Sequence, residues 1–486
     1  MSNGQTSLAY AVRPIVLIKY LGQLLVAQAC LMIPPLLASL YYSEYVFSRR
    51  FALVFSVTLM LGWAGQRVRA AQQIQVNEAL VIVALAFLVS PLLMFYPLSA
   101  AGYAPADTLF ETISAITTTG LTTVRDVEHS ARTFLFSRAW MQWYGGLGIV
   151  VLSVALLMRH QLAARRLTEV SLTENLATTA RSYARQMLWI YVCLTLLGFL
   201  LLWSLVGEAG VAMLHTFSAI STGGFSTYNN SLAGFSNRGA AYVVIVIAVL
   251  GAIPLPWYQR LKPRHWREAW LDVEFRALLL IGFLVTLALS LVYAGVVPQH
   301  NEHIVGNAFI SAFTAQTGAG FSIIDIGALS DSAKAVLILS MFIGGGVGST
   351  SGGIKLLRFL VLWRLLQFMI QRTAMPTHAM AGPRLREHSL ENDDIQRALI
   401  LVILFVTVIF LSWLLLLFEH YPALDALFEV VSATGTVGLS TGITSTGLAP
   451  LAKAVLCIDM LLGRVEIIAL LVVLYPSTWF GKRQKT

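Results

Sequence analysis

The sequence has few charged residues for its length. Only 12% of its 486 residues are Asp, Glu, Lys or Arg, whereas soluble proteins typically carry about 25%. Hydrophobic residues make up 57% of the chain, and the mean hydropathy is +0.74. Apolar runs such as 278–297, 398–418 and 454–475 reach the roughly 20 residues that cross a bilayer as a helix. This composition excludes an ordinary soluble domain and predicts an integral membrane protein.

Cysteine is also scarce, and the apolar runs hold no chemistry typical of an enzyme. The three cysteines have no metal-ligand spacing, so we expect buried free thiols at Cys30, Cys193 and Cys457. No nucleophile with a base and no metal cluster falls within an apolar run. We therefore expect that the chain is not an enzyme.

The net charge of +9 does not indicate a nucleic-acid-binding protein, because the basic residues gather in the connections between apolar runs. By the positive-inside rule, that face is cytoplasmic and both termini lie there. Arg49 and Arg50 are exceptions, since they lie on the predicted outer side. The connecting basic residues are Arg159, Arg165, Arg166, Arg181, Arg185, Arg260, Lys262, Arg264, Arg267, Arg372, Arg384, Arg386, Lys482, Arg483 and Lys485.

The most informative pattern is a motif that occurs four times. A Ser/Thr-Ala pair precedes a glycine, which is followed by Leu or Phe and then by Thr or Ser. Each copy lies between two apolar runs, so we expect helix–pore loop–helix repeats. The alternative is that glycine and serine only let membrane helices pack closely. This alternative could account for one copy of the motif, but it accounts poorly for four aligned copies. The aligned glycines are Gly120, Gly224, Gly320 and Gly438.

The predicted fold is an all-α integral membrane protein with four pseudo-symmetric repeats around a central pore. An N-terminal helix pair in residues 1–76 precedes them, which gives ten membrane spans. Repeats of the same orientation are related by an axis along the membrane normal, so their loops would surround that axis. The predicted repeats cover residues 77–182, 183–273, 274–393 and 394–486.

The four loops predict a site for a cation. Non-helical backbone at membrane depth is tolerated where it lines a polar cavity. Short pore helices, such as 109–117 and 427–435, would direct their negative C-terminal ends at the axis. Glycines would let carbonyl groups turn inward and replace a hydration shell, as in potassium filters. The predicted ion ligands are Thr118, Thr119, Gly120, Thr222, Gly223, Gly224, Gly318, Ala319, Gly320, Thr436, Val437 and Gly438.

Acidic residues near the loops have two interpretations. Glu111 and Glu429 are expected to begin pore helices, where they would attract cations or stabilise a helix N-terminus. Asp126, Glu128 and His129 could suggest a metal site, but their outer loop favours solvated charges. A tight divalent site would need carboxylates at the ring itself, so we expect a weak, carbonyl-based site for a large, easily dehydrated cation.

Repeat three contains a predicted gate. Its second helix would span 42 residues, from 331 to 372, or about 63 Å, which is longer than one span needs. Residues 344–355 are rich in glycine and hydroxyl groups and should break this helix. They lack the pattern of a nucleotide-binding loop. We expect a movable loop under the filter, with a static kink as the alternative, formed by Gly344, Gly345, Gly346, Gly348, Ser349, Thr350, Ser351, Gly352, Gly353 and Lys355.

Arg464 lies deep in the last apolar run, where a charge is costly and suggests function. In one interpretation it forms a structural ion pair with Glu466 or Asp459. In the other it faces the permeation path below the filter and acts with the loop as a barrier to cations.

Together these residues resemble the Trk/Ktr/HKT superfamily of potassium transporters, most closely its TrkH type, over nearly the whole chain. Further matching stretches are Gln142-Trp-Tyr-Gly-Gly-Leu-Gly148, residues 344–355 and Met460-Leu-Leu-Gly-Arg-Val-Glu466. The resemblance places Gly120, Gly224, Gly320 and Gly438 as filter glycines and favours the gating role of Arg464. Extra glycines in loops three and four leave the filter register there open.

The resemblance also implies function and partners. Glycine at all four positions favours potassium uptake through a channel-like pore in the bacterial cytoplasmic membrane. The alternative is a sodium-selective, or a sodium- or proton-coupled, potassium transporter of the same fold. The family implies a homodimer and a TrkA-like cytoplasmic nucleotide-binding subunit docked on the basic connections, with no nucleotide bound by this chain.

Overall fold

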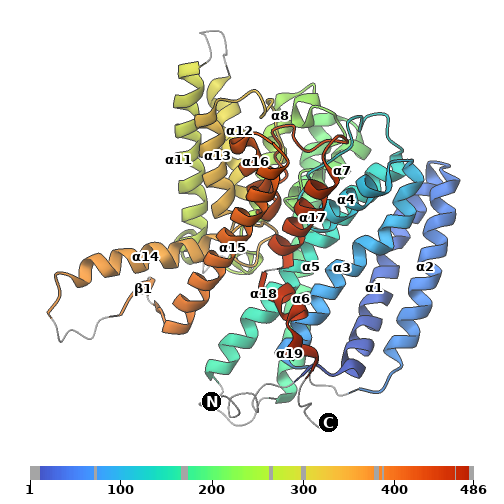
Figure 1. The fold of residues 1–486 in the computed structure, drawn as a ribbon, viewed down its shortest axis with the longest axis horizontal. Helices are drawn as coiled ribbons and strands as arrows, with labels where there is room; N and C mark the ends of the chain where they lie inside the picture. The colour runs from blue at the N-terminus through green and yellow to red at the C-terminus, as the bar shows by residue number, and fades with distance from the viewer. Residues whose placement is uncertain are drawn as a thin grey trace.

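The computed structural model shows a bundle of long helices with short helices between them at one end (Figure 1). Its first and last described segments are joined at the opposite end, where the Val12 amide donates to the Thr478 carbonyl oxygen at 2.8 Å. The structure describes residues 11–70, 74–165, 173–261, 266–296, 303–376, 382–385, 388–465 and 467–480.

The N-terminal pair is a tight hairpin of α1 (Pro14–Tyr41) and α2 (Tyr45–Gln66). A Cβ atom added to Gly22 would lie 2.6 Å from the Gln66 amide nitrogen. Small residues at such crossings let membrane helices pack backbone to backbone.

Each of four units then contains a long helix, a short helix, an irregular segment and a second helix. The first helices are α3 (Val76–Leu98), α6 (Thr173–Val206), α11 (Val273–Val296) and α15 (Asn392–Phe418). The short helices are α4 (Pro105–Ile116), α7 (Ala209–Ile220), α12 (Ile304–Thr317) and α16 (Ala423–Thr434). The second helices are α5 (Arg132–Arg165), α8 (Arg238–Ala252), α13 (Asp331–Ile343) and α17 (Pro450–Val465).

Minor elements complete the chain. They are η1 (Ser99–Ala101), η2 (Ser231–Gly234), α9 (Leu255–Tyr258), α10 (Trp266–Trp270), α14 (Leu356–Arg372), the antiparallel pair β1 (Arg384–Leu385) and β2 (His388–Ser389), α18 (Ile467–Leu474) and α19 (Pro476–Trp479).

Six helices of the described chain are long and apolar enough to cross a membrane: α1, α2, α3 with η1, the Ser182–Val206 part of α6, α11 and α15. Three of the second helices are shorter, with 15 residues in α8, 13 in α13 and 16 in α17. Large apolar side chains such as Leu37, Met60 and Leu291 are exposed on the outer helices. The molecule is therefore a multi-pass membrane protein with an apolar outer surface, as predicted.

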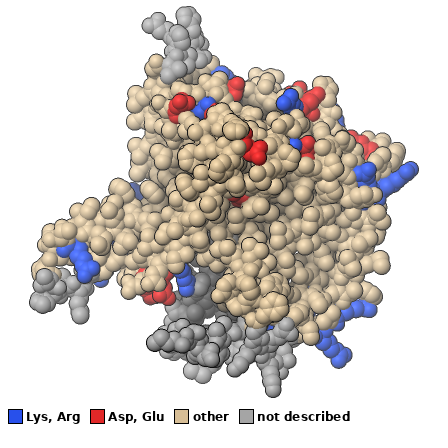
Figure 2. Space-filling view, viewed as in Figure 1, with Lys and Arg blue, Asp and Glu red and all other residues tan. Residues whose placement is uncertain are grey.

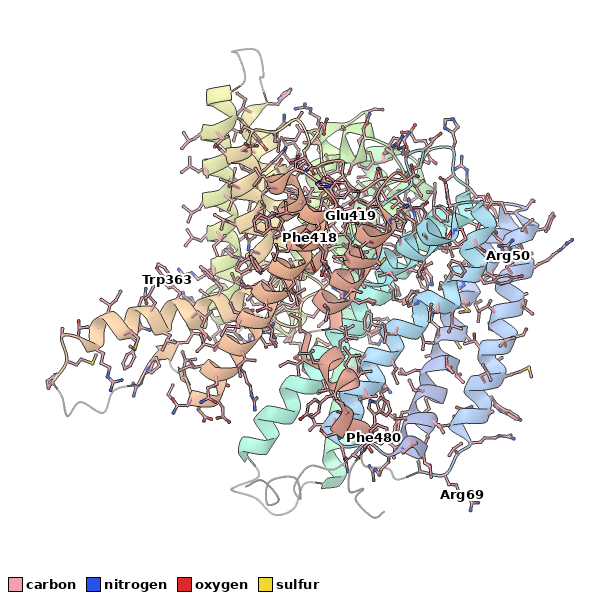
Figure 3. All side chains as sticks on the ribbon, in the orientation of Figure 1. Arg50, Arg69, Trp363, Phe418, Glu419 and Phe480 are labelled. Carbon is pink, nitrogen blue, oxygen red and sulfur yellow. The ribbon has the colours of Figure 1, made fainter. Side chains whose placement is uncertain are left out.

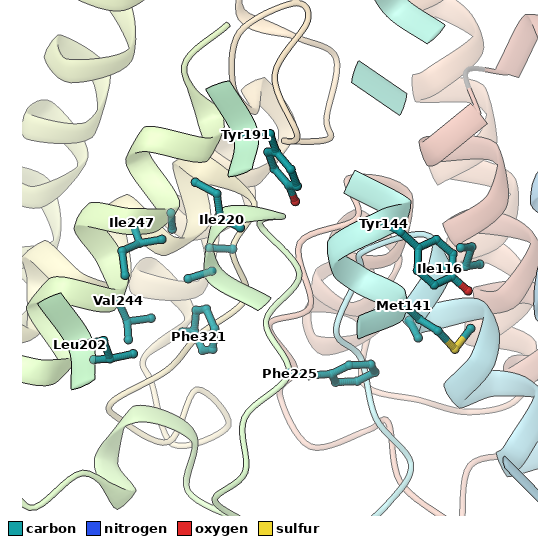
Figure 4. Close-up of a cluster of buried hydrophobic side chains, with 14 of the residues drawn as sticks. Ile116, Met141, Tyr144, Tyr191, Leu202, Ile220, Phe225, Val244, Ile247 and Phe321 are labelled. Atoms are coloured by element: carbon teal, nitrogen blue, oxygen red, sulfur yellow. The ribbon is translucent and has the colours of Figure 1, made fainter. Parts of the chain in front are cut away.

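Apolar side chains also fill the interior. One cluster joins residues from several repeats, including Ile116, Met141, Tyr144, Ile220 and Phe225 (Figure 4). The prediction of buried cysteines is wrong for two of the three, since Cys30 and Cys193 are exposed and Cys457 is half-buried. In a membrane an apolar sequence position can face either lipid or the core, so hydropathy alone does not predict burial.

Charged side chains are sparse across the middle of the visible face, and acidic ones lie mainly at its upper end (Figure 2). Arg69 and Phe480 lie at the lower end, whereas Arg50 lies towards the upper end (Figure 3). Arg50 donates to Ser99 Oγ at 2.6 Å and to the Tyr96 carbonyl at 3.3 Å, so it binds the end of α3. This local role gives a reason for the position of Arg50, one of the two exceptions to the charge pattern.

Part of the evidence for orientation lies outside the described structure. Arg166, Lys262, Arg264, Arg386, Lys482, Arg483 and Lys485, and the side chains of Arg159, Arg165 and Arg181, are not described. The assignment of the lower end to the cytoplasm stays a prediction.

The helix of repeat three ends at Ile343 and resumes at Leu356, so residues 344–355 interrupt it. The predicted break in this helix is confirmed, and beyond it α14 runs sideways from the bundle (Figure 1). The left-handed Lys355, with φ of 79°, immediately precedes α14 where the chain changes direction.

Candidate functional site

The four aligned glycines lie in a closed ring of contacts. A Cβ atom on any of them would overlap or crowd a carbonyl oxygen of the next repeat. The order of contacts returns to its start, so the four turns surround one axis. The pairs are Gly120 with Gly223 O, Gly224 with Ala319 O, Gly320 with Val437 O, and Gly438 with Thr119 O.

The backbone of these turns repeats as well. The glycines have φ of 88°, 84°, 71° and 92° in chain order. Two residues earlier, φ is also positive, at 53° in Thr118, 52° in Thr222, 71° in Gly318 and 48° in Thr436. Holding a threonine in this left-handed backbone conformation costs roughly 1–3 kcal/mol, and strained residues of this kind cluster at functional sites. Because the pattern recurs at equivalent positions, it supports one register in loops three and four, aligned on Gly320 and Gly438.

The Ser/Thr-Ala pair of the motif anchors each turn to the end of its short helix. The Ser114 carbonyl accepts a hydrogen bond from the Thr119 amide at 2.9 Å, and its hydroxyl accepts one from the Gly120 amide at 3.1 Å. Equivalent backbone bonds join Gly223 to Ser218, Ala319 to Thr314 and Val437 to Ser432, at 2.7–2.9 Å. These bonds explain why the pair recurs at a fixed distance from the glycine.

A cavity of about 510 Å³ opens above the ring. All four glycines line it, together with hydroxyl groups that follow them and the charged Arg125 and Asp325. Among the described residues, no group of three or more His, Cys, Asp or Glu side chains could hold a metal ion. Besides the single carboxylate of Asp325, this cavity offers a cation backbone carbonyls and hydroxyls. The hydroxyl residues are Thr122, Ser226, Ser322 and Ser440.

The two glutamates of the motif do not begin helices. The short helices start earlier than predicted, with Pro105 in the first turn of α4 and Pro422 before α16, so Glu111 and Glu429 are mid-helix and fully buried. Glu111 accepts from Arg138 at 2.7 Å and from Thr122 Oγ1 at 2.6 Å. The interpretation that these carboxylates stabilise a helix N-terminus is therefore wrong, and their attraction of cations stays a prediction.

Glu429 plays the same part in repeat four. Its carboxylate accepts hydrogen bonds from Ser440 Oγ at 2.5 Å, from the Thr441 amide at 2.8 Å and from Thr444 Oγ1 at 2.7 Å. His215 occupies the equivalent position in repeat two and lies 3.0 Å from Ser226 Oγ. In these three repeats, a buried polar side chain of the short helix therefore fixes the segment that leaves the ring.

The outer loop of repeat one carries an exposed ion pair. Asp126 and His129 are 2.8 Å apart, with exposed side-chain fractions of 57% and 85%. Hydrogen bonding between them lowers the pKa of Asp126 and raises the pKa of His129. This geometry agrees with solvated charges rather than a metal site.

The segment between α13 and α14 is buried and bonded to other repeats. Thr350 Oγ1 donates to the Ile220 carbonyl at the end of α7, at 3.0 Å, and to the Gly251 carbonyl at 2.9 Å. The Gly346 amide donates to the Ala252 carbonyl at 3.1 Å. The segment therefore lies against the end of a short helix and the second helix of repeat two.

The same segment lies directly against the loop of repeat four. A Cβ on Gly352 would overlap the Gly435 carbonyl oxygen and Thr436 Oγ1. Lys355 Nζ donates to the Ser351 carbonyl. None of residues 344–355 lines the cavity above the ring. Ser351, Gly352, Gly353 and Lys355 instead line a separate cavity with Arg464. The predicted gate residues therefore lie together, against the end of α7 and the loop of repeat four.

Arg464 is buried at the end of α17 and reaches two other repeats. One guanidinium nitrogen donates to the Thr350 carbonyl at 2.7 Å, and the other donates to the Gly145 carbonyl at 3.1 Å. Asp459, one predicted ion-pair partner, accepts from Ser412 Oγ at 2.7 Å instead. Glu466, the other, lies outside the described residues. Arg464 thus joins the interrupted segment of repeat three to α5.

Known proteins are similar to this chain in sequence. The family model described as "TrkH: Cation transport protein" matches residues 43–480. An uncharacterised cation transporter of Methanocaldococcus jannaschii is 29% identical over 92% of both chains. The Trk system potassium uptake protein TrkH of Escherichia coli is 27% identical over 95% of this chain and 98% of its own.

A solved structure agrees with the fold. The crystal structure of the potassium transporter TrkH from Vibrio parahaemolyticus has a TM-score of 0.85 to this chain, with 26% identity over 96% of this chain and 100% of that one. The chain therefore belongs to the TrkH family of cation transport proteins.

Proposed function

We propose that the protein carries potassium into the cell through a channel-like pore whose filter is formed by the four glycine turns. The observation that carries this proposal is the closed ring, in which each turn lies against a carbonyl oxygen of the next. Several relatives are named as potassium uptake proteins, which supports the same ion here.

Potassium suits such a site for a physical reason. Carbonyl rings select it by replacing its hydration shell, and glycine at all four positions lets the backbone approach the axis. One charge crossing 100 mV gains roughly 2.3 kcal/mol, so the membrane potential can drive accumulation without a nucleotide site on this chain.

In this proposal, residues 344–355 close the pore below the filter and Arg464 holds them closed. The hydrogen bond from Arg464 to the Thr350 carbonyl supports this role. A buried guanidinium next to the path would also repel cations. Opening requires the loop to leave the Ile220 and Gly251 carbonyls.

The assembly is proposed from resemblance. The protein would be a homodimer in a bacterial cytoplasmic membrane, with both termini inside. A TrkA-like nucleotide-binding subunit would dock on the cytoplasmic connections and control the loop.

Flux into liposomes tests the function. Reconstituted protein should pass potassium and rubidium much faster than sodium under an imposed potential. A clear sodium preference, or potassium flux that needs a sodium or proton gradient, would favour the alternative transporter of the same fold.

A further inference from the structure

Gln142 of α5 is fully buried and bound to the loop of the next repeat. Its amide nitrogen donates to the Gly223 carbonyl at 2.5 Å. Its oxygen accepts from Ser218 Oγ at 2.8 Å and from the Phe225 amide at 3.4 Å. One side chain of repeat one is therefore bonded to the short helix of repeat two and to two residues of the turn that follows it.

This arrangement replaces an internal bond that the other repeats have. The hydroxyls of Ser114 and Ser432 accept from the glycine amides of their own turns, and Thr314 accepts from the Phe321 amide at 2.8 Å. In repeat two the equivalent Ser218 donates to Gln142 instead. In repeat two, Gln142 therefore bridges the short helix α7 and the turn, which in the other repeats are joined directly by this side-chain hydroxyl.

Gly223 makes room for the Gln142 amide. A Cβ at position 223 would overlap the side-chain amide of Gln142, and the equivalent positions hold Thr119, Ala319 and Val437. The peptide between Gly223 and Gly224 has glycine on both sides, so its backbone is unusually free to rotate. Without an outside bond, this carbonyl would be the least restrained of the four in the ring.

The position of Gln142 is itself fixed by close packing. A Cβ on Gly145 would overlap the Ile116 carbonyl at the end of α4, and one on Gly146 would lie 2.8 Å from Ser221 Cβ. Helix α5 therefore lies tightly against the ends of two short helices. Its glycines hold the Gln142 side chain at a constant distance from the ring.

We propose that Gln142 is a positioning residue for ion selectivity, which orients the Gly223 carbonyl within the ring. This inference rests on the proposed filter function. Selectivity depends on the number and the field strength of the carbonyl ligands. Loss of the Gln142 bond would let one ligand turn away, and a smaller ion such as sodium would then be rejected less strongly.

The test uses full-length protein in liposomes and compares the potassium-to-sodium flux ratio. Gln142→Met keeps the length of the side chain but removes its donor. We expect the ratio to fall by about tenfold, the factor that corresponds to one lost buried hydrogen bond. Ser218→Ala, which removes only the hydroxyl that orients Gln142, should lower the ratio in the same direction by less.

Thr195→Val is the matched control. It removes the bond from Trp143 Nε1 to Thr195 Oγ1, 3.0 Å long, which lies one residue further along the same helix and does not involve a ring residue. It should leave the ratio unchanged.

Three outcomes are distinct. If neither the unmodified protein nor Arg464→Ala, in which the proposed gate is released, passes any alkali cation, the filter function itself is refuted. If the unmodified protein is selective and both variants keep its ratio, only the role of Gln142 is refuted. Equal losses of potassium and sodium flux in folded variants would indicate a purely structural residue and would also overturn the inference.

Discussion

Replacing Arg464 by alanine should increase potassium flux. In the proposed closed pore, the bond from Arg464 to the Thr350 carbonyl, 2.7 Å long, holds the loop, while the bond to Gly145 holds the arginine. A hydrogen bond to a charged group contributes about 1.5–3 kcal/mol. Loss of the Thr350 bond should therefore raise the open population by about 10- to 100-fold.

The assay is rubidium uptake into liposomes by purified, monodisperse protein. Arg464→Lys retains the charge, but a single ammonium group does not reproduce the two-pronged geometry of guanidinium. Arg464→Lys should therefore increase the rubidium flux less than Arg464→Ala does. The difference between the two variants separates the effect of the charge from the effect of the hydrogen bonds. Arg260→Ala, at an exposed position paired with Asp272 at 3.0 Å, is the control for loss of an arginine. Unchanged flux through folded Arg464→Ala protein would refute the reasoning.

Two further substitutions and one titration have defined outcomes. Gly120→Ser should sharply reduce the potassium-to-sodium flux ratio, because the new Cβ would overlap the Gly223 carbonyl oxygen; an unchanged ratio would argue against the ring. Lys453→Met leaves buried Asp107, now 2.6 Å from Lys453 Nζ, without its partner, and should destabilise the protein by about 3–5 kcal/mol. Thermal unfolding in detergent measures this loss, and Asp107→Leu in the same chain should restore much of it. For the exposed pair, NMR titration should show that Asp126 raises the pKa of His129. Their attraction is then present below the usual histidine pKa and is lost as the pH rises through the raised pKa of His129. A histidine titration midpoint at the ordinary value would contradict the pairing.

The sequence predicted the positions of the turns well because their signals are local. The spacing from the Ser/Thr-Ala pair to glycine reflects bonds within one turn, such as Thr119 to Ser114. The break at residues 344–355 was likewise readable from glycine content. These features depend on residues close together in the chain.

Contacts between repeats were not readable in the same way. Gln142 binds Gly223 across 81 residues, and Arg464 binds Gly145 across 319. The stretch that contains Gln142 matches a family motif, but its sequence alone does not indicate which group the side chain binds. A buried polar side chain in a membrane helix was the available signal, because such groups need a partner.

Helix direction and exposure also escaped the sequence. Helix α14 carries Arg358, Arg364 and Arg372 among its apolar residues, runs sideways and exposes Trp363 (Figure 3). Where lipid replaces water, both surface and core are apolar, so composition does not distinguish them. Glu111 was misplaced because the start of its helix was set too late, after the proline that begins it.

The central claim is that the four turns together bind the transported ion. Its most direct test is anomalous diffraction from crystals of the protein grown in rubidium, which substitutes for potassium. The account predicts a rubidium peak on the axis of the ring, surrounded by backbone oxygens of all four repeats. Rubidium bound only elsewhere, in protein that still transports it, would contradict the claim.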